Sequence, residues 1–301
     1  MPFDVVGLII ERSDYKEQLL LRKTSKSLRA LVDKQKPGCK SIEVFFYKEH
    51  LNITYNNQFV EYRSLDYECN NYTVIVVKRD DFKKVALDDL ASTLKNPKLQ
   101  LEEFVVYNGI ECSEKNCNEI RNVMKSLSHQ VSARKVNSYA SSPSCFLSIL
   151  PCLKPGFLTK IKLHIRGVSW RAYSTGMDQV AVLDQWKQAK ELELEDSFNK
   201  FPMKYARHFN RLQIYGVWID NDNLNRIKDF LSETELCTLS WLDFDTNFFA
   251  LYQLLGEPVS SNATEEVFHH LIPDSDYYFE IKKATKIRRL DIEKKKREIH
   301  S

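Results

Sequence analysis

The chain has 301 residues, of which 43% are hydrophobic, 12% aromatic and 28% charged, a composition typical of a globular protein. Its 44 basic and 41 acidic residues leave a formal net charge of +3, which argues against a general nucleic-acid binder with a strong basic excess. No run of about 18 apolar residues exists, and Asp4, Glu11 and Asp14 interrupt the apolar N-terminus, so we expect neither a membrane span nor a signal peptide.

Three short helices are expected near the N-terminus, over residues 2–12, 14–23 and 25–34. Pro2 suits the first helical turn, where its missing N–H would be unpaired anyway, and Asp14 stands at a helix-capping position. Pro37-Gly38 then ends the helical region. A bundle this small has little core of its own, so it leaves apolar surface that needs a partner. The segment is therefore a candidate docking module.

The next stretch favours strands. β-branched and aromatic residues recur in four runs, at 41–47, 51–55, 59–62 and 72–78, and Asn56-Asn57 separates two of these runs as a turn. This pattern predicts an antiparallel β-meander. A helix is expected over residues 87–94, before Asn96-Pro97.

A pattern of three apolar residues then recurs along the chain, in which two residues separate the first from the second and one residue separates the second from the third, as in Leu101, Phe104 and Val106. Its copies start at residues 101, 131, 158, 189, 209 and 236, and the weaker copy at 131 has Arg134 in the middle position. Helical segments are expected in the gaps, at 116–128, 144–153, 182–187 and 223–231. One strand and one helix per repeat is typical of a leucine-rich-repeat-like array. The asparagine position of such repeats is irregular here, so an ordinary α/β sheet remains the alternative.

The C-terminal region differs again, because residues 277–283 and 286–293 alternate like a hairpin and Lys294–Arg297 form a basic tail that we expect to fray. The fold class expected is mixed α/β. We divide the chain into a helical module at 1–38, the meander and its helix at 39–100, the strand–helix repeats at 101–272, and the hairpin with its tail at 273–301.

No catalytic constellation is recognisable, so we expect no enzyme and no catalytic, cofactor-binding or metal-binding residues. The chain lacks a glycine-rich phosphate loop and a nucleophile elbow. Cys112, Cys117 and His129 lack the second ligand pair that a zinc site needs. The seven cysteines are odd in number and scattered, which predicts reduced thiols and a cytoplasmic or nuclear protein. The many aromatic residues could line a binding face, although the sheet core is their commoner use.

The N-terminal segment resembles an F-box. That motif opens with Leu-Pro, continues with an aliphatic helix and a Leu-Leu-x-Leu-Arg core, and ends in a Lys-x-x-Arg-x-Leu-Val stretch. The corresponding residues here align without gaps and are Met1-Pro2, Val5-Val6 with Ile9-Ile10, Leu19–Arg22 and Lys26–Val32. One departure is Leu28, which stands where tryptophan is common.

The remainder resembles the FTH domain of F-box proteins that are expanded in nematodes, on the strength of the segments 150–156, 183–192 and 272–276. The resemblance implies a substrate adaptor of a Skp–cullin–F-box ubiquitin ligase, with the FTH region as the reader of a protein substrate. It also implies partners, namely a Skp-family adaptor and through it a cullin. From the lack of a long apolar run, no membrane partner is expected. Contacts with the adaptor are expected from Pro2, Val5, Val6, Ile9 and Leu19. The alternative is a ligase-independent scaffold for protein or RNA with a vestigial F-box.

Overall fold

The computed structural model describes residues 3–13, 15–34, 37–65, 75–108, 114–140, 143–165, 170–195, 201–215, 225–226, 229–230, 232–234, 238–242, 252, 255–272, 275–287 and 289–297. The chain folds as two compact units. The first comprises Met1–Leu158 and Leu183–Trp186, and the second comprises Thr159–Val182 and Lys187–Ser301. Both units contain helices and strands, so the predicted mixed α/β class is confirmed.

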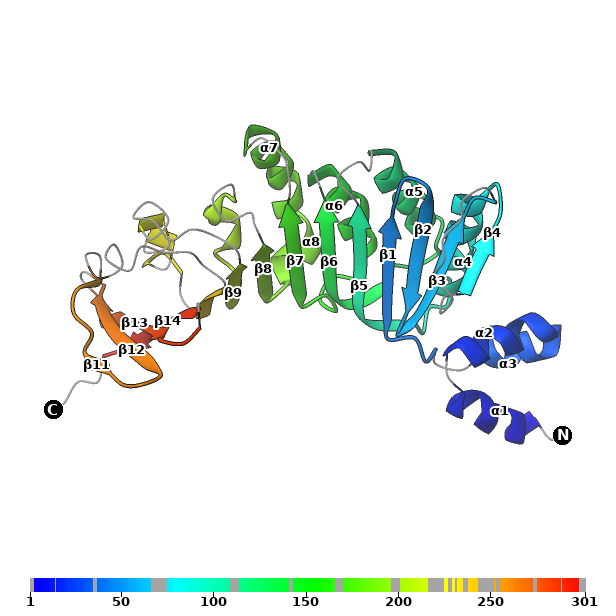
Figure 1. The fold of residues 1–301 in the computed structure, drawn as a ribbon, viewed down its shortest axis with the longest axis horizontal. Helices are drawn as coiled ribbons and strands as arrows, with labels where there is room; N and C mark the ends of the chain where they lie inside the picture. Colours follow the sequence, from blue (N-terminus) through cyan, green and yellow to red (C-terminus); the bar gives the residue numbers. More distant parts are fainter. Residues whose placement is uncertain are drawn as a thin grey trace. The chain divides into compact units, whose positions relative to one another are not determined.

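Three helices open the first unit, namely α1 (Phe3–Arg12), α2 (Tyr15–Thr24) and α3 (Lys26–Lys34), as Figure 1 shows near the N-terminus. They occupy the segments in which helices were expected. The Ser13 amide closes α1 by donating to the Ile9 carbonyl over 2.9 Å. The hydroxyl of Ser25 accepts a 3.1 Å hydrogen bond from the amide of Leu28, which is the N-cap contact that starts α3.

The sheet of the first unit has the strand order β6-β5-β1-β2-β3-β4. Its strands are β1 (Ser41–Phe46), β2 (His50–Tyr55), β3 (Gln58–Arg63), β4 (Ile75–Lys78), β5 (Gln100–Asn108) and β6 (Ser132–Ala140). Antiparallel pairing joins β1 to β2 and β2 to β3, and Asn56 makes the second turn with a φ of 54°. Asparagine tolerates that left-handed backbone better than most residues.

The predicted meander is wrong for its fourth strand, because β4 pairs with β3 in parallel, with Val60 opposite Ile75. Residues 64–74 connect these two strands, and this connection is far longer than the tight turn that an antiparallel hairpin needs. Alternating side chains identify a strand, but they carry no information about its direction. The strand β1 likewise pairs in parallel with β5, with Val44 opposite Val106.

Figure 1 shows the helices α4 (Phe82–Leu94), α5 (Glu114–Lys125) and α6 (Pro143–Ile149) together on one side of this sheet. The helix predicted at 87–94 thus begins earlier, at Phe82. The core lies between these helices and the sheet, and it includes the buried side chains of Ile42, Val44, Phe46, Leu90, Phe104 and Ile120. The other face of the sheet carries no helix among the described residues of the unit (Figure 1).

A disulfide joins Cys117 of α5 to Cys145 of α6, with a Cα–Cα distance of 5.0 Å. The expectation that all cysteines are reduced thiols is therefore wrong for this pair. The two helices pack side by side on the sheet and bring together residues 28 positions apart, which a list of cysteine spacings could not reveal. Cys39 and Cys152 are free thiols.

The second unit orders its strands as β11-β12-β13-β14-β10-β9-β8-β7. Four of them run parallel, namely β7 (Lys160–Ile165), β8 (Glu191–Glu195), β9 (Arg211–Tyr215) and β10 (Thr238–Leu242), with α7 (Trp170–Ala181) following β7. The second position of the repeated pattern is in register across these strands, in the series Ile161, Leu192, Leu212 and Leu239. A leucine-rich-repeat-like array stays a prediction.

The C-terminal strands pair antiparallel, and they are β11 (Ser260–Ser261), β12 (Glu265–Leu271), β13 (Tyr277–Ala284) and β14 (Arg289–Lys296). The basic stretch that we expected to fray is paired within β14 up to Lys296, which lies opposite Tyr277. Lys295 is held by a 2.7 Å ion pair with Glu280 of the neighbouring strand. Across the described ranges of the chain, no helix is long and apolar enough to cross a membrane.

Candidate functional site

The outer side of α1 is apolar and exposed. Val5, Leu8 and Ile9 have exposed fractions of 43%, 57% and 47%, whereas the neighbouring Ile10 is fully buried. Residues spaced three and four apart share one face of a helix. The three exposed side chains therefore form one apolar surface, which we call the α1 face, while Ile10 attaches the helix to the rest of the first unit.

The structure places the five predicted adaptor contacts unequally. Val5 and Ile9 are exposed on the α1 face, and Val6 is half-buried. Leu19 lies in α2, but its side chain is outside the described part, as is all of Pro2. Sequence reasoning missed Leu8, although its spacing from Val5 already placed it on the same helical face.

Gln18 fixes the end of α1 relative to the first strand. Its side chain is 4% exposed, and its amide nitrogen donates to the carbonyls of Ile10 (3.0 Å) and Ser13 (3.2 Å). Its side-chain oxygen accepts a 3.4 Å hydrogen bond from the Gly38 amide. One buried side chain thus joins α1, the turn that follows it and the segment leading into β1.

Tyr15 attaches α2 to the body of the unit. Its hydroxyl donates a 2.8 Å hydrogen bond to Oγ1 of Thr93 in α4, and its ring centroid lies 5.6 Å from that of Tyr55. Burial raises the pKa of Tyr15 well above its ordinary value, so the phenol stays neutral as a donor. Lys98 adds an exposed contact, since its Nζ donates to the Lys34 carbonyl at the end of α3 over 2.6 Å.

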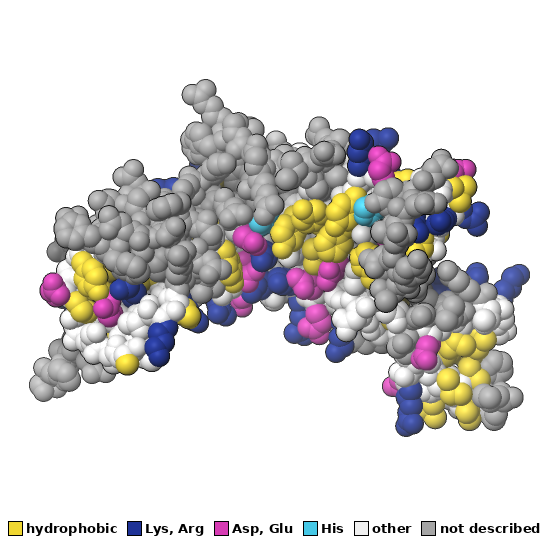
Figure 2. All heavy atoms as spheres, in the orientation of Figure 1, with side chains coloured by type: hydrophobic (Ala, Val, Ile, Leu, Met, Phe, Trp, Pro, Cys, Tyr) yellow, Lys and Arg dark blue, Asp and Glu magenta, His cyan; other side chains and the backbone are white. Residues whose placement is uncertain are grey.

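A second surface lies on the helix-free face of the same sheet. Phe45, Tyr47, Tyr107 and Tyr139 form a series of neighbouring rings, which we call the aromatic row. The centroid distances are 5.6 Å from Phe45 to Tyr107, 6.4 Å from Tyr47 to Tyr107, and 5.2 Å from Tyr107 to Tyr139. Figure 2 shows the hydrophobic side chains of this face gathered in one open patch. The aromatic residues of this sheet thus serve both roles considered from the sequence, because Phe46 and Phe104 are buried in the core.

Carboxylates adjoin the aromatic row on the same face. Glu43 and Glu103 precede Phe45 and Tyr107 on β1 and β5, and Glu103 forms a 3.0 Å ion pair with Lys135 of β6. Partial burial raises the pKa of Glu43, and the nearby charge of Glu103 raises it further. The negative charge of Glu43 is therefore poorly compensated, and a cation beside it would be stabilised.

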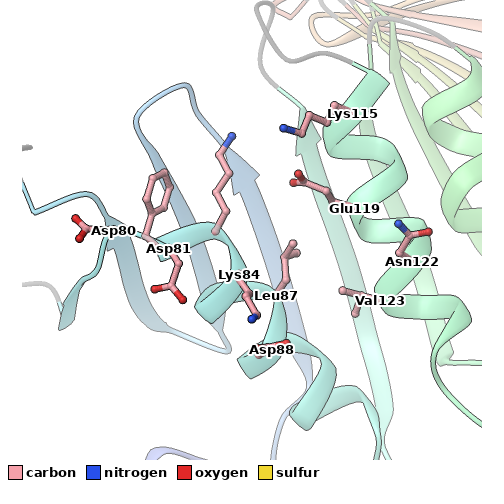
Figure 3. A pocket seen from close by; sticks show the side chains of 11 residues that line it. Asp80, Asp81, Lys84, Leu87, Asp88, Lys115, Glu119, Asn122 and Val123 are labelled. Atoms are coloured by element: carbon pink, nitrogen blue, oxygen red, sulfur yellow. The ribbon is translucent and has the colours of Figure 1, made fainter.

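A groove of about 530 Å³ lies between α4 and α5 in the same unit. Figure 3 shows Leu87 and Asp88 from α4, and Lys115 and Glu119 from α5, among the side chains that line it. One carboxylate oxygen of Glu119 is buried and accepts no hydrogen bond from the described residues. Because charges of both signs line the groove, it does not select one kind of ligand. Among the residues that the structure describes, no group of three or more histidine, cysteine, aspartate or glutamate side chains gathers where it could hold a metal ion.

Two family models match the chain. The F-box domain model matches residues 1–40, and the FTH domain model matches residues 114–250, which lie inside the predicted strand–helix repeat region at 101–272. The F-box match thus contains the α1 face. The FTH match includes α5 and β6, and with them Tyr139 of the aromatic row.

Two curated proteins of Caenorhabditis elegans are similar to the chain. It is 25% identical to F-box A protein 224 over 250 residues, which cover 77% of this chain and 62% of that protein. It is 27% identical to F-box A protein 155 over 179 residues, which cover 55% of this chain and 41% of that protein. The chain therefore spans less than two thirds of the length of either relative.

Proposed function

Because this chain is a nematode-type F-box protein that carries an FTH domain, we propose that it is the substrate-recognition subunit of a Skp–cullin–F-box ubiquitin ligase. In this role the F-box docks on a Skp-family adaptor, the FTH region captures a protein substrate, and the chain itself performs no catalysis. Its effect is proximity, since a tethered substrate reaches a high effective concentration near the ubiquitin-charged enzyme. The proposed location is the cytoplasm, the nucleus or both.

The α1 face is the observation that carries this proposal. Fully burying one aliphatic side chain contributes roughly 1.5–3 kcal/mol. Val5, Leu8 and Ile9 are about half exposed, so covering them by a partner offers roughly half of that amount each. Pro2, Val6 and Leu19 remain proposed contacts beside this face.

The test is co-purification of the intact chain with a Skp-family adaptor. Replacement of two anchors by carboxylates, in the variant Val5→Asp with Ile9→Asp, is expected to abolish the complex because it buries charges against apolar surface. Val182→Asp is the matched control, since Val182 is 64% exposed in the second unit. Circular dichroism must show that both variants remain folded.

Two results decide against the proposal. If the folded double variant recovers as much adaptor as the unmodified chain, then α1 is not the docking helix. If the unmodified chain forms no complex at micromolar concentrations, the alternative applies, namely a scaffold that binds protein or RNA without a ligase.

A further inference from the structure

We propose that the helix-free face formed by β1, β5 and β6 binds an extended segment of a partner protein through lysine or arginine side chains that lie on the aromatic row. The identification of that segment as part of a ligase substrate rests on the proposed function. The binding surface itself does not, because it depends only on the rings, charges and hydrogen-bond acceptors of this face.

The register of the sheet creates the aromatic row. Phe45 lies directly opposite Tyr107 in the parallel pairing of β1 with β5, and Tyr107 lies opposite Tyr139 in the pairing of β5 with β6. In-register side chains on one face stand side by side, about one strand spacing apart. Ring faces attract ammonium and guanidinium groups, most strongly where water is partly excluded. The row therefore offers adjacent sites for cationic side chains.

The charges beside the row favour the same ligand. Glu43 lies one pleat from Phe45 and Glu103 lies two pleats from Tyr107, and Lys135 forms an ion pair with Glu103. A cation on the rings would also relieve the repulsion between Glu43 and Glu103. The phosphates of a nucleic acid would instead be repelled by the carboxylates, so the face does not suit an RNA that stacks its bases on the tyrosines.

Hydrogen-bond acceptors under the face lack donors. Asn52 lies opposite Phe45, and Asn137 lies opposite Val105, so both asparagines belong to this face. Each is 7% exposed, and the side-chain oxygen of each accepts no hydrogen bond from the described residues. Lysine and arginine side chains carry only donors, so a cationic head group that reached either oxygen would satisfy it.

The dimensions fit an extended segment. The row crosses three adjacent strands, which is about 10 Å at the usual strand spacing, and an extended chain covers that distance with roughly three residues. A ligand with cationic side chains at alternate positions would place them on one side, toward the rings.

The experiment measures fluorescence anisotropy with the intact chain. The probe is a labelled peptide of alternating arginine and alanine, compared with matched peptides in which glutamine or glutamate replaces arginine. We expect the arginine peptide to bind, the glutamine peptide to bind at least about tenfold more weakly, and the glutamate peptide not to bind. Tyr107→Leu, which keeps an apolar side chain, is expected to lower the affinity for the arginine peptide about threefold to tenfold.

A second variant and a control keep the result interpretable. Glu43→Gln removes only the charge of a half-buried carboxylate, and it is expected to weaken binding and flatten its salt dependence. Tyr277→Leu, whose tyrosine is 37% exposed in the second unit, should bind like the unmodified chain. Equal binding of the glutamine peptide, or unchanged binding by Tyr107→Leu, overturns the proposal. The proposal is also overturned if single-stranded oligodeoxythymidine binds the unmodified chain and this binding is lost in Tyr107→Leu.

The same samples separate this inference from the ligase assignment. Adaptor binding without arginine-peptide binding overturns the inference and leaves the proposed function in place. Arginine-peptide binding that depends on Tyr107, without adaptor binding, supports the surface and removes only its assignment to a ligase substrate.

Discussion

The hydroxyl of Tyr15 donates a hydrogen bond to Oγ1 of Thr93 across 2.8 Å, and this buried contact joins an F-box helix to α4. Thr93 in turn donates to the Asp89 carbonyl over 3.1 Å. Two consecutive hydrogen bonds therefore attach the F-box to the rest of the first unit, in addition to the burial of Ile10.

Removing this hydroxyl should weaken the unit. We expect Tyr15→Phe to lower the free energy of unfolding by about 0.5–1.5 kcal/mol. The Thr93 hydroxyl would still donate to the Asp89 carbonyl, but it would no longer accept a hydrogen bond from residue 15. Denaturant titration measures the change. Tyr277→Phe, at a site 37% exposed, is the control and should stay within about 0.5 kcal/mol. Equal effects of the two variants would show that the Tyr15 contact contributes nothing.

Gln18 should control the placement of α1. Gln18→Ala removes the hydrogen bonds that Gln18 makes with the Ile10 and Ser13 carbonyls and with the Gly38 amide, at a cost of about 1–3 kcal/mol. We expect faster amide hydrogen exchange in Phe3–Arg12 and weaker adaptor binding, while exchange in α5 stays unchanged. Unchanged exchange in α1 would contradict the role given to this side chain.

Leu8 should matter as much as the contacts expected from the sequence. It is 57% exposed on the same face as Val5 and Ile9, so Leu8→Asp should weaken adaptor binding at least about tenfold. Surface plasmon resonance with immobilised adaptor measures the affinity, and Val182→Asp again serves as the control. Full affinity in Leu8→Asp would remove Leu8 from the interface.

Cys39 should make stability fall at alkaline pH. Burial raises the pKa of its thiol from 9.0 to about 12, so the unfolded chain ionises first. The contribution is complete below about pH 9 and is lost as pH rises toward 12, by up to about 1.4 kcal/mol per pH unit from this thiol. Unfolding titrations at several pH values should show a shallower decline in Cys39→Ala, and parallel curves would contradict this assignment.

The disulfide between Cys117 and Cys145 should stabilise the first unit. Closing a loop of 28 residues typically contributes about 2–4 kcal/mol. We expect a reductant to lower the unfolding midpoint of the unmodified chain, but not that of the variant with serine at both positions. A midpoint insensitive to reductant in the unmodified chain would show that the bond is not formed in solution.

The sequence predicted much of the local structure for local reasons. Apolar spacing and a proline placed the N-terminal helices, and asparagine at residue 56 marked a turn whose left-handed backbone suits that residue. The error at β4 has an equally clear reason, since alternation identifies a strand but does not give its direction. From the sequence, the aromatic residues could either line a binding face or fill the sheet core. Strand alternation could not decide between these two roles, because it does not say which face of the sheet the helices cover.

The sequence by itself determined the mixed α/β class, the positions of most helices and strands, and the F-box and FTH character, because these depend on short-range periodicity and on motifs. Only the tertiary structure decided which side of α1 is exposed, which cysteines meet, and that the rings of Phe45, Tyr107 and Tyr139 share one face. These features arise where segments far apart in the chain pack together. The physical reason is that burial and strand register are properties of the assembled sheet and not of any single segment.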